Sequence, residues 1–434
     1  MMLDPLAEPV YPLEKAEFAR ALAAGLGRAM IHAERCGAEG VRDLILDAAL
    51  DPKLYDIQCN GYGEEWLAKL CSLAGLVDTV IAADPGGSGR EAKLRCRLLK
   101  EFGLQGHATA RTALREMCRF DEESDDMLAC DEIVELEGEE GFIFVAERLG
   151  ERLLADKEFQ IYPTADRVLD EKSGEGTAMA ILERESPGNP RIAGYREAVI
   201  GNQARIVERK EQPRPAAEQI REMILTSDKR LWRLRSYGEK ATMAERLEVA
   251  SLDFTKLGAL SLENYLNYFQ ETGFPEFREE YLELLRTAEE RNRWRAHAVL
   301  SHHAHPAVRR AAYEAHARGE ASYFVRLLCS SGLREDTEPV LDAISAPEIL
   351  ADEDECHEIG LRLLELVENN PAMDDVRLLL WTYQNNPCMC CRYSAVRHMV
   401  GRSILPEWAT GECLADAEED IRKMAAEYRG APQG

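Results

Sequence analysis

The chain has 434 residues, more than the roughly 100–200 residues typical of one domain, so several compact domains or one extended repeat array are both possible. Its net charge of -26 opposes binding to nucleic-acid backbones and anionic membrane surfaces, and it favours a basic protein partner or simple solubility. No run of about 18 apolar residues predicts a membrane span, and the N-terminal stretch MMLDPLAEPVYPLEKAEF lacks the apolar core of a signal peptide.

Apolar residues recur with the period of an α-helix through the first 210 residues. In EAKLRCRLLKEFG, Leu94, Leu98 and Phe102 lie at i, i+4 and i+8, which predicts one helix with a single apolar face. A second helical pattern, ATARTALREMC, follows after the turn GLQGH. The only β-like run is FIFV at 142–145, and a helical pattern follows it at once. We therefore predict an almost wholly helical chain.

A glycine-rich stretch, ADPGGSGREAK from Ala83, has the composition of a phosphate-binding loop but not its chemistry. Such a loop needs Gly-Lys followed by Ser or Thr at the start of a helix, and here Gly89 is followed by Arg90. No strand precedes the stretch. We therefore predict a turn that leads into a helix, and no nucleotide or other cofactor.

The middle of the chain combines basic and aromatic residues. DKRLWRLRSYGEK (228–240) and RNRWRAHAV (291–299) have the composition of grooves that bind nucleic acids, where cations contact phosphates and aromatic rings stack on bases. The same composition also suits an acidic protein partner, an intramolecular partner or a plain solvated helix face. The candidate partner-binding residues are Arg230, Trp232, Arg233, Arg235, Arg293 and Trp294.

Pairs of short helices return in the last third of the chain. The pattern at 307–317 is followed by SYFVRLLCSSG, and DDVRLLLWTYQ is followed by the turn NNP and CMCCRYSAVRHMV. EEDIRKMAAEYRG matches a first helix alone. Repeated pairs of this kind bury their apolar faces by stacking on one another, which is typical of a helical solenoid.

HPAVRRAAYEA, DDVRLLLW and EEDIRKMAAEY resemble the first helices of HEAT repeats, in which a Pro or an acid precedes a Val/Ile-Arg pair and small apolar residues. The resemblance covers roughly a third of the chain, chiefly 84–135 and 300–430. It implies an all-α fold, a right-handed α-solenoid of antiparallel helix pairs. On this basis we expect HEAT-like repeats at 1–210, a less regular helical segment at 211–290, and further HEAT-like repeats at 291–434.

Three cysteines and a histidine fall within NPCMCCRYSAVRHMV (386–400). Asn386 suits a helix N-cap and Pro387 the first turn, so the stretch predicts a helix. On that helix Cys391 and His398 share a face but lie about 10.5 Å apart along the axis. Zinc ligands lie roughly 2.0–2.3 Å from the ion, so these two residues cannot share one metal. We therefore predict thiols packed against the neighbouring repeat, and no metal site.

The remaining histidines and cysteines give no further site. His302, His303 and His305 precede a helix in SHHAHPAVRR without a Cys, Asp or Glu among them, so we expect a solvated or capping role. The 12 cysteines lack the spacing of a disulfide framework, which favours reduced thiols and a cytoplasmic location.

The sequence contains no GxSxG, HExxH or EF-hand motif, so we predict no catalytic residue and leave the question of enzymatic activity open. The leading hypothesis is a non-enzymatic scaffold that binds a protein partner on the extended surface of the solenoid. Because HEAT-like solenoids include DNA glycosylases, the resemblance leaves a nucleic-acid-binding repair protein as the alternative, which the net charge disfavours. A chromophore lyase or chaperone, also found among related repeat proteins, has no distinguishing residue here.

Overall fold

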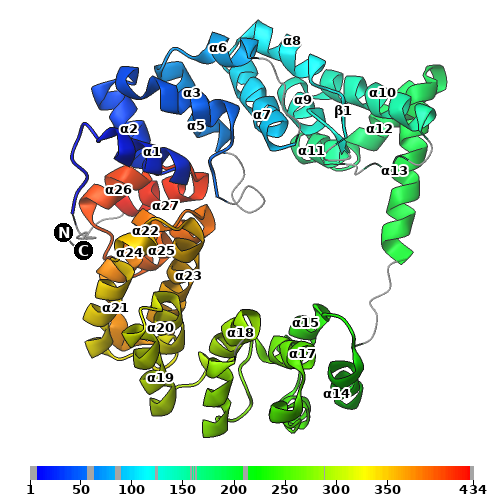
Figure 1. Ribbon diagram of the computed structural model, residues 1–434. Helices are drawn as coiled ribbons and strands as arrows, with labels where there is room; N and C mark the ends of the chain where they lie inside the picture. The colour runs from blue at the N-terminus through cyan, green and yellow to red at the C-terminus, as the bar shows by residue number, and fades with distance from the viewer. Residues whose placement is uncertain are drawn as a thin grey trace. The chain divides into compact units, whose positions relative to one another are not determined.

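The computed structural model describes residues 7–55, 63–83, 89–122, 126–156, 159, 161, 164–208, 214–287 and 289–430. These residues are almost wholly helical, as the sequence predicts (Figure 1). Among them, none of the helices combines the length and the apolar character that crossing a bilayer requires. The glycine-rich stretch at 84–88 and the predicted boundary at 210 lie outside the described residues.

The chain forms two compact units. The first unit comprises Pro9–Glu211 and Trp408–Gly434, and the second comprises Met1–Glu8 and Gln212–Glu407. The helices and strands of the first unit are α1 (Lys15–Ala24), α2 (Gly27–Cys36), η1 (Glu39–Val41), α3 (Arg42–Leu50), α5 (Glu64–Leu73), α6 (Val77–Ala82), α7 (Arg90–Leu104), α8 (Ala108–Glu116), β1 (Phe120–Asp121), β2 (Asp126–Met127), α9 (Cys130–Glu137), α10 (Glu139–Ala155), α11 (Thr164–Ser173), α12 (Thr177–Glu185), η2 (Ser186–Gly188), α13 (Pro190–Glu208), α26 (Glu407–Cys413) and α27 (Glu419–Gly430).

The second unit is built from helices alone in its described part. They are α14 (Ala217–Thr226), α15 (Arg233–Glu239), α16 (Met243–Ala250), η3 (Phe254–Lys256), α17 (Ala259–Phe269), η4 (Glu279–Arg286), α18 (Glu290–Leu300), α19 (Pro306–Ala317), α20 (Ala321–Leu328), η5 (Arg334–Asp336), α21 (Thr337–Ile344), α22 (Pro347–Leu350), α23 (Glu353–Asn369), η6 (Pro371–Met373), α24 (Val376–Asn385) and α25 (Met389–Gly401).

The β-like run at 142–145 lies within α10 and is not a strand. Phe142, Val145, Ala146 and Leu149 are all buried, at i, i+3, i+4 and i+7. This helical face packs against α9 and α13, so the period of burial outweighs the local preference of Phe and Val for strands. The strands that do form, β1 and β2, are a two-residue antiparallel hairpin that the sequence analysis missed.

Helices that follow one another along the chain pack as neighbours. In the second unit α19 packs on α20, α20 on α23, and α23 on α24 and α25. Several side-chain hydrogen bonds join residues 32 to 36 positions apart, such as Arg97 to Glu64, Arg230 to Glu263, and Cys329 to the carbonyl of Arg362, and others span from 27 to 45 positions. Separations of this size are expected when consecutive helices pack as neighbours.

Candidate functional site

The side chains of Arg230, Arg235 and Trp294 make contacts within the chain. The Nε atom of Arg230 donates to Glu263 at 3.0 Å, and Arg235 lies 2.6 Å from Glu271. Trp294 is half-buried on α18, with the guanidinium of Arg326 placed 4.5 Å from the ring centroid. Arg230 and Arg235 are still about half exposed, so a partner can reach them.

Trp232 is the exposed member of the set. Its side chain is 68% exposed, although tryptophan is a residue that folded proteins usually cover. The segment before it is fixed by two buried asparagines of α17. Asn264 accepts a hydrogen bond from the backbone N–H of Leu231 at 2.9 Å, and Asn267 donates to the carbonyl of Leu231 at 3.0 Å. Trp232 is therefore held out from a rigid support.

Arg233 is exposed beside Trp232, at the start of α15, while Arg293 is half-buried on α18. Arg293 offers its backbone carbonyl to Nδ1 of His297, at 2.7 Å. Helix α15 itself lies very close to α17, because a Cβ atom at Gly238 would stand 1.7 Å from the carbonyl oxygen of Tyr268. The structure thus brings the 228–240 stretch against α17. No contact between Arg293 and Trp232 is found among the described residues.

A buried carboxylate lies among several guanidiniums beneath this surface. Glu263 is only 6% exposed, and besides the bond from Arg230 its Oε1 atom lies 3.4 Å from Arg295 and 3.7 Å from Arg291. Arg295 is 8% exposed, and its Nε has no hydrogen-bond partner among the described residues. Burial lowers the pKa of Arg295, and the nearby Arg230 and Arg235 lower it further against the opposing effect of Glu263. One carboxylate therefore faces three guanidiniums.

The three histidines of the 302–305 turn have structural roles. His305 is the N-cap of α19, and its Nδ1 accepts a hydrogen bond from the N–H of Ala307 at 3.2 Å, which confirms the capping role. Burial lowers the pKa of His303 to about 4. His302 contacts the carbonyl of Gln270 through Nε2, at 3.0 Å.

The cysteine-rich stretch forms a helix, as its sequence predicts, but the helix begins at a different residue. Cys388, not Asn386, is the N-cap of α25. The Asn386 side chain is fully buried and bridges two helices instead: its Nδ2 donates to the carbonyls of Cys356 and His357 on α23, each at 3.3 Å. Its Oδ1 accepts from the N–H of Cys388 at 2.9 Å. Asn386 therefore fixes the start of α25 against α23.

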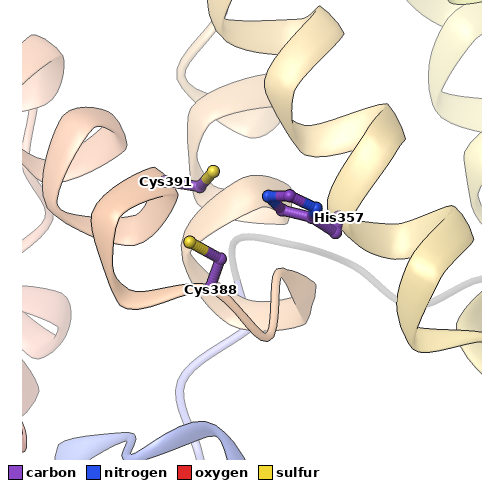
Figure 2. A group of neighbouring side chains, drawn as sticks. All are labelled: His357, Cys388 and Cys391. Carbon is purple, nitrogen blue, oxygen red and sulfur yellow. The ribbon is translucent and has the colours of Figure 1, made fainter. Parts of the chain in front are cut away.

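This contact brings together a group that the sequence analysis missed. Figure 2 shows His357 of α23 facing Cys388 and Cys391 of α25. One ring nitrogen and the two sulfur atoms all lie within 4.8 Å of one another. Both thiols are only 4% exposed, whereas His357 is half-buried and Cys390 is exposed. We call His357, Cys388 and Cys391 the thiol–imidazole group.

At the start of α25, the pKa values of the two thiols are shifted in opposite directions. Several effects together lower the pKa of Cys388 to about 4, and the largest is a hydrogen bond from the Cys391 thiol. Hydrogen bonds from His357 and from the backbone N–H groups of Cys391 and Cys390 also lower this pKa, while burial raises it. The hydrogen bond between the two thiols, together with burial, raises the pKa of Cys391. Several donors directed at the sulfur of a helix N-cap favour the thiolate form, and thiolates are the form that binds metals and attacks electrophiles.

The sequence indicated two of the three members of this group. Cys388 and Cys391 have the C-x-x-C spacing, which places two sulfur atoms in the first turn of a helix. His357 lies 31 positions upstream of Cys388, on helix α23, which packs against α25. His398, which the sequence analysis considered as a possible metal ligand together with Cys391, is not a member of the group, as its distance from Cys391 along the helix predicts.

Comparison with known proteins gives this chain no relative. No family model matches it, and searches of curated proteins and of solved structures also return no match.

Proposed function

We propose that the chain is a non-enzymatic binding protein, a right-handed α-solenoid of HEAT-like helix pairs that takes a protein partner on an extended surface. The all-helical architecture and the packing of consecutive helices both support a solenoid. The observation that carries the binding role is Trp232, exposed on a rigid support next to a cluster of guanidiniums. A reducing location such as the cytoplasm suits its thiols, since no disulfide joins the described cysteines.

Exposed apolar side chains concentrate around this residue in the sequence. Of the five large apolar side chains that are exposed in the described part of the second unit, four lie between positions 225 and 247: Leu225, Trp232, Met243 and Leu247. The end of a repeat array is usually polar, because it faces water. An apolar and aromatic surface there favours a partner, and tryptophan and arginine are the residues that most often dominate binding energy.

The local charge indicates the chemistry of the partner. The net charge of the chain favours a basic partner, but charges farther away than about 10 Å are largely screened at 0.1 M salt. Arg230, two positions before Trp232, shares the carboxylate of Glu263 with Arg291 and Arg295 of α18. We propose an acidic segment of a protein, whose carboxylates pair with Arg230 and Arg233 while an apolar side chain covers Trp232.

The nucleic-acid alternative uses the same arginines for phosphates. It is the weaker candidate, because a long polyanion would also meet the acidic remainder of the chain, whereas a short acidic peptide meets the local surface only.

The test compares two probes of similar charge on the full-length chain. A fluorescent Glu-rich peptide with one Leu and one Phe, and a single-stranded oligonucleotide of the same charge, are titrated by anisotropy at physiological salt. We expect the peptide to bind, and Trp232→Ala and Arg233→Glu each to weaken it about tenfold or more. Leu154→Ala, which removes an exposed apolar side chain from the first unit, is the matched control and should change nothing.

Both variants lie at the surface, so their unfolding midpoints should stay close to that of the wild type. Tighter binding of the oligonucleotide, lost in Arg233→Glu, would replace this proposal with the nucleic-acid alternative. Binding of neither probe would remove Trp232 and its neighbours from consideration as a partner surface.

A further inference from the structure

We propose that the thiol–imidazole group is a zinc site in which His357, Cys388 and Cys391 supply three ligands and leave the fourth position to water or to an external ligand. The three ligand atoms lie within 4.8 Å of one another. Around a tetrahedral zinc ion with bonds of about 2.0–2.3 Å, neighbouring ligand atoms stand about 3.5–3.8 Å apart. Small rotations of the side chains therefore complete the geometry without moving the helices. The proposal differs from the sequence-based prediction of no metal, which considered Cys391 and His398 only.

The donor atoms select the class of metal. Two thiolates and one imidazole form a soft set, which zinc accepts and which magnesium or calcium, with their preference for oxygen, does not. Two thiolates also balance the charge of Zn²⁺, so the bound ion can be buried as a neutral unit. Among the described residues, no carboxylate belongs to the group.

The surroundings hold the ligands in place from both helices. Asn386 bonds at once to the carbonyl of His357 and to the N–H of Cys388, so one side chain positions a ligand on each helix. Helix α23 admits it only because position 360 is glycine, since a Cβ atom there would lie 2.0 Å from the Asn386 amide nitrogen. Polar residues that orient metal ligands in this way are a regular part of metal sites.

Neither core packing nor redox chemistry accounts for all three residues. Thiols that only fill space in a core need no imidazole nitrogen directed at them. A redox-active disulfide between Cys388 and Cys391 uses two members of the group, and both sulfur atoms are too well buried for a protein thiol to reach. A metal ion uses all three residues, and its site is independent of the partner surface, which lies on α15 to α18.

The experiment titrates the reduced, chelator-treated full-length chain with Co²⁺, whose absorption spectrum reports thiolate ligands and tetrahedral geometry, and then displaces it with Zn²⁺. We expect one Co²⁺ per chain, with sulfur-to-cobalt charge-transfer bands that disappear as Zn²⁺ is added. The variants Cys388→Ser, Cys391→Ser and His357→Gln should each weaken Zn²⁺ binding about tenfold or more. Cys390→Ser, which changes an exposed thiol in the same turn, is the matched control and should bind as the wild type does.

His357 is only half-buried, so His357→Gln should fold even where a change of a buried cysteine does not, and its circular-dichroism spectrum checks this. A wild-type chain that takes up no Co²⁺ or Zn²⁺ at micromolar concentrations would overturn the proposal. Equal loss of binding in Cys390→Ser, or a Cys388–Cys391 disulfide formed readily by a chain that binds no metal, would overturn it as well.

Discussion

Glu132 is a carboxylate that burial keeps partly protonated near neutral pH. It lies on α9 and lines a cavity of about 210 Å³ together with Asp131, Lys93 and Arg97. Burial raises the pKa of Glu132 to about 7; Arg97, whose Nε is 3.6 Å away, acts in the opposite sense. The unfolded chain holds this proton only below about pH 4.5. Between these two values the folded chain binds one more proton than the unfolded chain, so a rise in pH favours unfolding.

Glu132→Gln should therefore stabilise the first unit at high pH and not at low pH. At pH 8 the wild type carries a buried charge that the amide lacks, and we expect the variant to gain about 2–3 kcal/mol in free energy of unfolding. Below about pH 4.5 the carboxyl is neutral in both states, and the gain should vanish. Urea denaturation at pH 4.5 and pH 8 measures this difference, with the exposed Glu175→Gln as control. An equal effect at both pH values would show that the pKa of Glu132 is not raised.

Asn386 and Gly360 depend on one another, and a double-mutant cycle measures how much. Asn386→Ala removes the three hydrogen bonds of a fully buried amide and should cost about 2–4 kcal/mol of stability. Gly360→Ala pushes a methyl group against that amide and should also destabilise. Because the first change makes room for the second, the double variant should lose less than the sum of the two. Additive losses in denaturant unfolding would mean that the two residues do not interact.

For single residues, the sequence predicts the position of a side chain along its own helix better than it predicts which residues that side chain will contact. Cys388 and Cys391 could be placed in the first turn of a helix from their spacing alone. His357 could not be assigned to them, since its position depends on how α23 packs on α25. Arg295 and Glu263 were missed for a similar reason: a charged residue in a polar-looking stretch gives no sign that it will be buried. Trp232, which the sequence analysis named as a candidate contact residue, is exposed.

Among the elements, helices with a clear apolar period were the most predictable. The pattern of Leu94, Leu98 and Phe102 lies in α7, and all three side chains are fully buried. The β1–β2 hairpin could not be found, since strands of two residues show no alternation. The side-chain hydrogen bonds that join neighbouring helices span from 27 to 45 residues, so they define no single repeat length to compare with the about 40–47 residues of a HEAT repeat. Membership of that family stays a prediction.

The support of Trp232 by α17 can be tested at the level of the element. Asn264→Ala removes the acceptor of the Leu231 N–H and one donor to the carbonyl of Lys229. We expect faster amide hydrogen exchange at positions 229–232, because this segment has lost a fixed backbone contact, and unchanged exchange in α19 and α20. Binding of the acidic peptide should weaken in parallel, since Trp232 is no longer held in place. Unchanged exchange at 229–232 would show that Asn267 alone is sufficient.

At the scale of the whole molecule, the C-terminal helices are part of the same compact unit as the N-terminal helices. Helices α26 and α27 pack with the first unit, and Figure 1 shows them (red) beside α1 and α2 (blue). The N–H of Ala417 donates to the carbonyl of Gly25, and the indole of Trp66 donates to the carbonyl of Ala415 at 2.8 Å. Contacts across about 350 residues leave no trace in a local pattern. The sequence therefore placed EEDIRKMAAEYRG in a segment at 291–434, and that three-part division stays a prediction.

A buried ion pair joins the C-terminal helix α26 to the N-terminal helix α2. Nε of Arg28 on α2 donates to Glu412 on α26 at 2.9 Å, and the two side chains are only 9% and 2% exposed. A Cβ atom at Gly27 would stand 1.9 Å from the carbonyl oxygen of Glu412, so the backbones themselves meet here. Such a pair adds little net stability over an apolar one, but removing Glu412 would leave the buried Arg28 with the more distant carboxylate of Glu17, 3.7 Å from its Nη1.

Removing the returning helices should therefore loosen the first unit and not the second. We expect Glu412→Gln to cost about 3–5 kcal/mol of stability, and deletion of residues 408–434 to expose an apolar face that lowers solubility. The exposed pair of Glu419 with Lys423 is the control, and Glu419→Gln should cost less than about 0.5 kcal/mol. Amide exchange followed by mass spectrometry locates the effect, because α2 and α5 should lose protection while α20 and α24 keep theirs. Full protection of α2 and α5 in the deletion variant would contradict this prediction, since the first unit would then be stable without its last two helices.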